Sequence, residues 1–499
     1  MRLGIRMFGA AVIAVGLMAG PARADDPPRD AFYWLNEMNK ASAVMVMETG
    51  IVPRPLGARI ADSIRQVIEQ GARPGAQRSA DYLVVERGLI AAGGPDVTRL
   101  HSGRSRQDIG ATYGVLFLRE DVLDLLDALG AAREAVLAMA ARNPDSIMPA
   151  YTWGVQAQPI SFGHYMLGYA AALSRAATRL REGYARVNLS PLGAAALGTS
   201  SFPVDRPRLA ALLGFDGVLE NSLDANQISA MDIRAELDNA AATGALTVGM
   251  LIADITQQYA QTRPWLILTE GSETGVSSIM PQKRNPSGLV FLRMLSSNVV
   301  SGAQMYAMRA HNVPSGMHDY KVFGPDAVLR DAARMYQNLA GVLSALRFDP
   351  ERALAEVNDD YSTTTELADV LQREADVPFR IGHHFASDLV TYGRRNRLRA
   401  SEIPFAEAQR IYAEAARGFG QTDARLPLTE ERFRESLSAE GMVRASRGLG
   451  GPQPSEVQRM LTVQRAALEG DRAWIAAARA RLQAAERERD AAFARLSSP

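Results

Sequence analysis

Two serines, a lysine and an asparagine lie within one short polar run of the sequence, GVSSIMPQKRNP at residues 275–286. An apolar segment with helical spacing follows it, from Pro286 to about Ala310. The N-terminus of a helix attracts anions, and nearby amide, hydroxyl and ammonium groups add hydrogen-bond donors. The run therefore has the chemistry to bind a negatively charged group. The residues alone are equally compatible with an ordinary polar surface loop.

Long helices are expected to position this run. Helical periodicity extends over residues 30–69, 111–141, 162–184 and 231–262, alanine is abundant, and aromatic residues make up only 7% of the chain. No alternation typical of strands persists for more than a few residues, so the predicted fold class is all-α. Helices of roughly 25–30 residues rarely bury themselves within one subunit, which favours a bundle shared between subunits. The charged amphipathic tail at residues 454–496 is predicted to be a solvated surface helix or helical hairpin.

Composition excludes several classes of protein. The chain of 499 residues is longer than a single hydrophobic core supports, so two or three domains are expected. Lys+Arg and Asp+Glu both number 55, which gives no indication of a nucleic-acid or anionic-membrane partner. The absence of cysteine excludes disulfides, thiolate metal sites and cysteine nucleophiles. The sequence has no histidine/carboxylate ligand cluster and no dinucleotide fingerprint, so no metal or organic cofactor is predicted.

The first 24 residues are predicted to be a secretory signal peptide. Arg2 and Arg6 precede an apolar run at residues 8–20, and ARA at residues 22–24 fits the small-x-small cleavage rule. An uncleaved anchor is the alternative, but the run is too short to span a bilayer comfortably. Cleavage removes three of the 55 basic residues and no acids, leaving 52 against 55. The mature protein is therefore predicted to be periplasmic and soluble, with no later stretch approaching a membrane span.

The run at residues 275–286 resembles the signature loop of the fumarase/aspartase superfamily, in which a glycine precedes two serines and then Met-Pro, Lys and Asn-Pro. Other segments resemble the argininosuccinate lyase branch of that superfamily. HSGRSRQD at residues 101–108 is similar to its His-Thr-Gly-Arg-Ser-Arg-Asn-Asp loop, and further matches lie at residues 151–164, 190–206, 213–225, 367–369 and 377–380. The resemblance thus covers nearly the whole mature chain.

This resemblance implies a three-domain helical fold of the fumarase/aspartase type. An N-terminal helical domain would span residues 25–111, a central long-helix bundle residues 112–356, and a C-terminal helical domain residues 357–499. The central bundles of four chains would combine in a homotetramer, with each active site built from three subunits.

Family members remove a proton from the carbon beside a carboxylate and expel an amine from the next carbon, which leaves fumarate. The intermediate is a doubly charged aci-carboxylate, and fixed donors aimed at that charge stabilise it. The resemblance places the catalytic serine base at Ser277 and a carboxylate-binding lysine at Lys283. A free serine is too weak a base at neutral pH, so its surroundings must stabilise its alkoxide. The resemblance gives substrate-binding roles to Ser278, Asn285, Arg106, Gln107 (an asparagine in the family) and Thr152.

The sequence departs from the family on the side of the site that meets the amine. Trp153 replaces the family's histidine after the threonine, and Val290 replaces the glutamate that pairs with that histidine. Their joint replacement leaves no buried glutamate without its partner, which indicates a repacked and more apolar site. Residues 226–229 and 316–321 also differ from the family, and Val276 stands at a signature glycine. The succinyl side is therefore kept and the amine side rebuilt.

The proton for the departing amine must then come from another group or from water. Of the six histidines, only His318 lies in a segment that the family places against the amine, beside Asp319, Tyr320 and Lys321. An imidazole titrates near neutrality and could donate that proton, which makes His318 a candidate catalytic residue. The alternative is that His318 only contacts the substrate or packs within its loop.

Three functions fit the resemblance. The favoured one is a carbon–nitrogen lyase that eliminates an amine other than arginine from an N-substituted aspartate, as ethylenediamine-disuccinate lyases do. A non-catalytic homologue, like the δ-crystallins, is disfavoured by the presence of Ser277, Lys283 and Asn285. A true argininosuccinate lyase is disfavoured by Trp153 and Val290. The predicted partners are a small-molecule substrate and identical subunits, whereas the sequence identifies neither the amine nor the physiological direction of the reaction.

Overall fold

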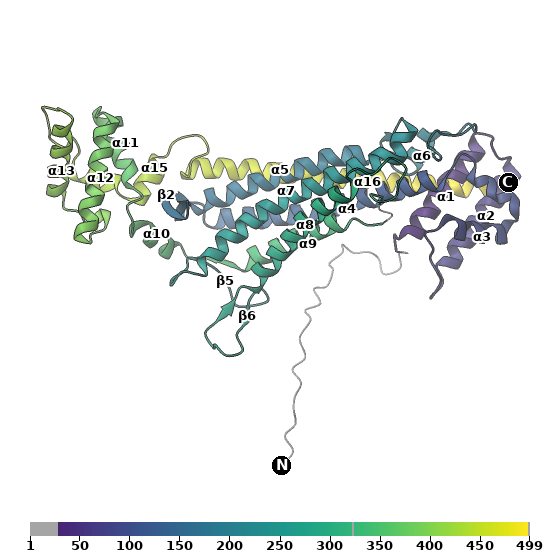
Figure 1. The fold of residues 1–499 in the computed structure, drawn as a ribbon, viewed down its shortest axis with the longest axis horizontal. Coiled ribbons are helices and arrows are strands. Elements are labelled where there is room, and N and C mark those ends of the chain that lie inside the picture. Colours follow the sequence, from purple (N-terminus) through teal and green to yellow (C-terminus); the bar gives the residue numbers. More distant parts are fainter. Residues whose placement is uncertain (1–27, 322–323, 498–499) are drawn as a thin grey trace, which may run out of the picture.

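The protein is an elongated helical molecule in the computed structural model, which describes residues 28–321 and 324–497. A bundle of long helices forms its middle, with a smaller group of helices at each end (Figure 1). The signal peptide predicted at residues 1–24 lies outside the described residues and stays a prediction. The all-α fold class is confirmed, because the described strands are short and pair only in twos between long helices.

The central bundle consists of helices that pack along their length. Its members are α4 (Arg106–Arg142), α5 (Phe162–Val187), α7 (Ser229–Gln258), α8 (Ser287–Ala310), α9 (Ala327–Ala345) and α16 (Pro454–Ala494). Together they bury one continuous core, rich in leucine, alanine and valine. Glycine lets two of them approach closely, because a Cβ on Gly244 of α7 would come within 2.1 Å of the Tyr336 hydroxyl of α9. The bundle is thus a tightly packed frame for the loops at its two ends.

A second core lies at one end of the bundle. It contains α1 (Ala31–Glu48), α2 (Arg54–Gly71), α3 (Tyr82–Gly93), α6 (Arg206–Leu212) and the 3₁₀ turns η1 (Pro95–His101) and η4 (Arg495–Ser497). The parallel two-residue strands β3 (Leu189–Ser190) and β4 (Gly217–Val218) pair beside them. Side chains from the first turns of α4 join this core and later ones join the bundle core. The start of α4 is therefore held from two sides.

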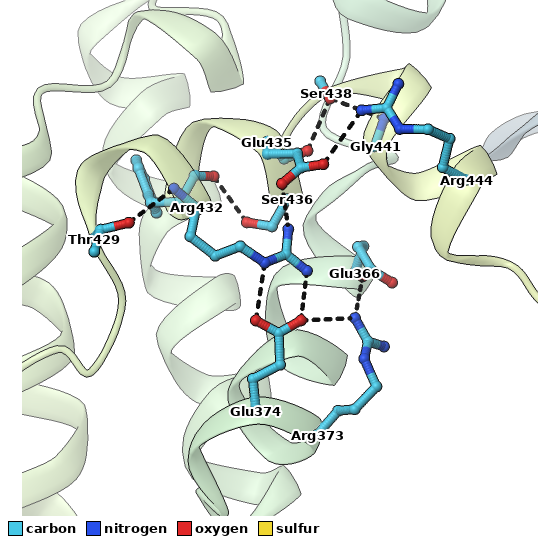
Figure 2. A network of polar contacts seen from close by, with 11 residues as sticks. Glu366, Arg373, Glu374, Thr429, Arg432, Glu435, Ser436, Ser438, Gly441 and Arg444 are labelled. Carbon is cyan, nitrogen blue, oxygen red and sulfur yellow. Dashed lines mark hydrogen bonds and ion pairs between the residues drawn. The ribbon is translucent and has the colours of Figure 1, made fainter.

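A third group of helices lies at the opposite end. It contains α10 (Pro350–Asn358), α11 (Thr364–Ala375), α12 (Phe379–Asn396), η3 (Ala400–Glu402), α13 (Phe405–Gly418), α14 (Glu430–Ser436) and α15 (Ala439–Ala445). Arg432 of α14 donates to both carboxylate oxygens of Glu374 of α11, at 2.7 and 2.9 Å, and Arg373 bridges Glu374 to Glu366 (Figure 2). Such partly exposed pairs contribute about 1 kcal/mol or less each. The apolar core beneath them supplies most of the stability of this group.

The tail helix α16 is part of the bundle, so its interpretation as a solvated surface helix is wrong. It is one helix of 41 residues, and Leu461 and Leu468 are buried in the bundle core. Asp471 accepts from Arg133 of α4 at 2.5 Å and from Arg181 of α5 at 2.6 Å. Some charged side chains of α16 therefore form buried contacts and do not face water. A count of charges along the sequence does not distinguish these two cases.

The helix at residues 224–258 also corrects an expectation. The π-helical turn η2 (Asp224–Ile228) continues into α7. The resulting helix has 35 residues, and a window of 18 of them has a mean hydropathy of 1.2, which is apolar enough for a membrane span. The sequence-based statement that no later stretch approaches a span is wrong in that sense. In the fold, α7 packs against α5, α8 and α9, which is the place of a bundle helix.

Short pairs of strands lie between the helices, and the sequence did not predict them. β1 (Ile147–Thr152) pairs antiparallel with β2 (Val155–Ser161), β5 (Leu266–Leu268) pairs with β8 (Leu346–Phe348), and β6 (Gly275–Val276) pairs with β7 (Arg284–Asn285). The β1–β2 and β6–β7 hairpins carry residues that the resemblance assigns to the active site.

Candidate active site

The signature loop is the connection of the β6–β7 hairpin, which projects from the bundle just before α8 (Figure 1). Gly275 pairs with Asn285 and Val276 pairs with Arg284. Ser277 and Lys283 are therefore the next residues on the two sides, facing each other across the mouth of the loop. The register of two short strands thus brings the predicted base and the predicted carboxylate-binding cation together.

Backbone amides of the loop are directed at the hydroxyl of Ser277. Its Oγ accepts from the N–H of Met280 at 3.1 Å and from the N–H of Ile279 at 3.4 Å. Donors that point at an oxygen favour its charged form. Two such donors are what the predicted role of Ser277 as a base requires. The sequence shows the serine, but only the fold shows which amides face it.

The foot of the loop is anchored to the start of α8. Arg284 forms an ion pair with Glu270 at 2.8 Å and donates to the Pro281 carbonyl at 2.8 Å. The Glu273 carbonyl accepts from the N–H of Gly288 at 2.9 Å. A Cβ on Gly288 would come within 2.1 Å of a carboxylate oxygen of Glu273, so a larger residue there would force the Glu273 side chain to move. With Arg284 held in structural contacts, Lys283 is the cation that the loop presents at its exposed side.

The start of α4 presents Arg106 and Gln107. Ser105 and Asp108 form a capping box there, and Asp108 also accepts from the N–H of Gly193 at 2.9 Å. Burial raises the pKa of Asp108 to about 6, although these backbone donors act in the opposite direction. The cap fixes the first turn, so Arg106 is exposed and Gln107 is half-buried at a defined position.

Lys321 is a polar residue of the candidate site that the sequence reasoning did not single out. Its Nζ donates to the side-chain carbonyl of Gln107 at 2.9 Å and to that of Gln227 at 2.6 Å. The residue is 9% exposed, and burial lowers its pKa. The bond to Gln107 uses the carbonyl oxygen of its side-chain amide, so the NH₂ group of that amide is not bonded to the lysine. The only signal in the sequence was the position of Lys321 three residues after His318 in a segment that departs from the family.

Lys321 also ties the segment of His318 to the start of α4. The N–H of Lys321 donates to the His318 carbonyl at 3.0 Å, and the His318 side chain lies at an exposed position. The fold thus brings Arg106, Gln107 and His318 to one end of the bundle. His101, in the neighbouring loop, stacks on Tyr82, and burial lowers its pKa to about 4. It is neutral at pH 7 and is a poor proton donor there.

Thr152 lies at the opposite end of the bundle, in the β1–β2 hairpin. It pairs with Val155, so Trp153 and Gly154 form the two-residue turn between the strands. Tyr151 donates from its hydroxyl to Glu356 of α10, which attaches the hairpin to the third group of helices. Thr152 itself is exposed. Its side chain is available to a ligand or to another chain.

One chain does not assemble these segments into one site. α4 has 37 residues and therefore separates Gln107 from the β1–β2 hairpin by about 55 Å. α8 has 24 residues, so about 36 Å of helix separates the signature loop from the segment of His318. Arg106, Gln107 and His318 belong to one end, and Thr152 and the loop of Ser277 belong to the other part of the bundle. Residues of different chains must meet if all of them contact one substrate.

Comparison with known proteins agrees with these features. Residues 66–301 match the family described as Lyase, and residues 361–444 match the family described as Argininosuccinate lyase C-terminal. Argininosuccinate lyase of Methanosarcina barkeri is 30% identical to this chain, with 87% of each chain covered. Argininosuccinate lyase 2 of Agrobacterium fabrum is 33% identical, with 86% of each chain covered.

Solved structures give the same result. An EDDS lyase in complex with formate is similar with a TM-score of 0.85 and 29% identity, over 94% of this chain and 92% of that one. A variant of EDDS lyase with bound fumarate has a TM-score of 0.84 and 30% identity, with the same coverage. The fold and the signature loop define a helical lyase of the fumarase/aspartase superfamily. Within it, the chain belongs to the argininosuccinate lyase family and is a carbon–nitrogen lyase of that type.

Proposed function

We propose that the protein eliminates an amine from an N-substituted aspartate and releases fumarate. The observation that carries this proposal is the geometry of the signature loop, where two backbone amides face the Ser277 hydroxyl and Lys283 lies across the loop mouth. A base and a cation so arranged suit proton abstraction beside a carboxylate. The bound fumarate in the EDDS lyase variant and the argininosuccinate lyase relatives support the same product.

In the proposed reaction, the Ser277 alkoxide takes a proton from the carbon beside one carboxylate. The electron pair moves into that carboxylate and gives an aci-carboxylate, whose added charge Lys283 and the loop amides stabilise. The pair then returns to form the carbon–carbon double bond as the carbon–nitrogen bond breaks. The amine takes up a proton on leaving. Arg106, Gln107, Asn285, Ser278 and Thr152 are proposed to bind the succinyl part of the substrate.

The test is a fumarate assay on the purified full-length protein. Argininosuccinate and a panel of N-alkyl and N-aryl-alkyl aspartates would be supplied, and fumarate would be followed by its ultraviolet absorbance. We expect release from at least one N-substituted aspartate at a higher kcat/KM than from argininosuccinate. No fumarate from any substrate would favour the non-catalytic homologue, and the highest kcat/KM with argininosuccinate would favour a true argininosuccinate lyase.

We propose that four copies assemble and that each site combines segments of different subunits. Two helices of the bundle keep apolar residues exposed, including Leu246 and Met250 on α7. On α8 the exposed positions Phe291, Met294, Asn298, Ser301, Met305 and Met308 recur with alternating spacings of three and four. That spacing is the seam of a helix packed against another helix. The separation of the site segments within one chain supports the same arrangement.

Light scattering of the purified protein at micromolar concentration should therefore give four times the chain mass. Replacing Met294 and Met305 together with glutamate should break the α8 seam, lower the mass and abolish fumarate release. A matched pair of glutamates at exposed polar positions of α16, Gln458 and Gln483, should change neither. A monomeric wild-type mass together with full activity would contradict the shared site.

We propose His318 as the donor of the proton to the amine, because the structure ties its segment to Gln107 through Lys321. With a slow substrate whose chemistry limits the rate, His318→Gln should lose the alkaline limb of the pH–rate profile and keep KM nearly unchanged. The profile is measured from pH 5 to 10 beside wild type. An unaltered alkaline limb in His318→Gln would leave His318 with a contact or packing role.

A further inference from the structure

Trp153 occupies a strained backbone position. It is the first of two residues in the β1–β2 turn, with φ of +56°, and Gly154 follows with φ of +74°. Two-residue hairpin turns with positive φ at both positions prefer asparagine, aspartate or glycine at the first. Holding a bulky residue in this sparsely populated backbone conformation costs a free energy on the order of 1–3 kcal/mol. Residues with strained backbones cluster at ligand sites, which makes Trp153 a candidate ligand contact.

Among the residues that the structure describes, none packs against the side chain of Trp153. It is 101% exposed, whereas Trp34 and Trp265 are buried and Trp474 is half-buried against the bundle core. A large aromatic side chain stabilises a fold only by burying its surface. In the isolated chain, no stabilising contact of Trp153 therefore compensates for its strained backbone and its exposed ring. The strained backbone and the exposed ring are both explained if the ring contacts a ligand or another chain.

The other segments of the candidate site are also apolar where they face outward. Val276 and Ile279 of the signature loop are 77% and 82% exposed, and Met317 beside His318 is 52% exposed. Residues 150–158 and 275–286 contain no aspartate or glutamate, and residues 313–321 contain only Asp319. The segments thus offer carboxylate-binding cations and apolar surface, but few counter-charges for a substrate group with a second positive charge.

We propose that Trp153 forms an apolar wall against the leaving amine, so that the preferred substrates are aspartates with an aromatic or bulky apolar N-substituent. This inference rests on the proposed function and names its substrate class. The ring would cover the N-substituent by apolar contact, and its face would attract the protonated amine by cation–π interaction. Thr152, next to it on the same hairpin, would hold the succinyl part. Argininosuccinate carries a further α-ammonium group, for which these segments offer few carboxylate partners.

Kinetics with two substrates test the wall. N-benzylaspartate and N-methylaspartate differ in the group that Trp153 would contact. We expect Trp153→Ala to lower kcat/KM for N-benzylaspartate roughly ten- to a hundredfold more than for N-methylaspartate, with most of the difference in KM. Trp153→Phe should restore most of the loss. Leu449 is an exposed apolar residue in the loop before α16, and Leu449→Ala is the matched control. It should leave kcat/KM unchanged for both substrates.

Fluorescence gives a second readout that does not require turnover. N-benzylaspartate should change the emission of the exposed Trp153 in wild type and should not in Trp153→Phe, while light scattering checks that both variants keep the wild-type mass. An equal loss on both substrates, or no ligand-dependent emission change, would overturn the inference even if fumarate is released. A wild-type emission change without fumarate from any N-substituted aspartate would instead retain the wall and overturn the proposed function.

Discussion

Replacing Ser277 with alanine is expected to lower kcat for fumarate release by about 10²–10⁴-fold, the usual contribution of a positioned base. The hydroxyl is needed for proton transfer, whereas its structural contribution is small. In the loop it only accepts from the N–H groups of Ile279 and Met280, and the loop lies at the surface, where water can replace that acceptor. The secondary structure and the mass in solution should therefore be those of wild type.

Ser278→Ala is the matched control for this variant, because it removes the neighbouring hydroxyl from the same loop. It should lower kcat much less than Ser277→Ala does. Steady-state kinetics on both variants, with circular dichroism and light scattering to check their integrity, decide the assignment. Near-normal turnover by Ser277→Ala would remove Ser277 as the base, and a larger loss in Ser278→Ala would move that role to Ser278.

Lys283→Ala is expected to raise KM and lower kcat together, with a loss in kcat/KM of about 10²–10³-fold. The ammonium group meets a carboxylate in the bound substrate and carries more of the interaction when the aci-carboxylate gains charge. Arg284 does not replace it, since Glu270 and the Pro281 carbonyl hold that guanidinium at the foot of the loop. Truncation at Lys283 therefore removes the charge from the mouth of the loop.

Two variants make this prediction specific. Gln282→Ala changes the exposed neighbour of Lys283 and should leave both constants near those of wild type. Lys283→Arg keeps the charge but changes its shape and reach, so it should recover part of KM and less of kcat. A loss confined to KM in Lys283→Ala would show uniform binding of substrate and transition state, and would exclude Lys283 from stabilising the intermediate.

The sequence by itself determined the class of fold and the parts of the chemistry that are local. Helical periodicity predicted α4, α5, α7 and α8 close to their observed bounds, because each buries a continuous apolar stripe. The run at residues 275–286 identified the signature loop, because its function depends on residue types at fixed short spacings. The superfamily followed from the same motif, and the argininosuccinate lyase family followed from further segments such as residues 101–108. The family is confirmed by the relatives.

Only the tertiary structure decided how distant segments meet. The bonds of Lys321 to Gln107 and Gln227 join residues more than 90 positions apart, and no local pattern encodes such a contact. The burial of Asp471 between Arg133 and Arg181 was likewise invisible in a charged, amphipathic tail. The β1–β2 turn at Trp153 was missed, because a short hairpin depends on its register more than on alternation of residue types.

The separation of the site segments along the bundle is the largest point that the sequence could not settle. Arg106 and Thr152 are 46 positions apart in the chain, yet most of that interval is the single helix α4, which keeps its two ends apart. Helix propensity and apolar spacing determine that α4 forms, and its length then determines that these residues cannot meet within one chain. A motif identifies residues that take part in one reaction. The length of the helices determines whether a single chain can bring those residues together.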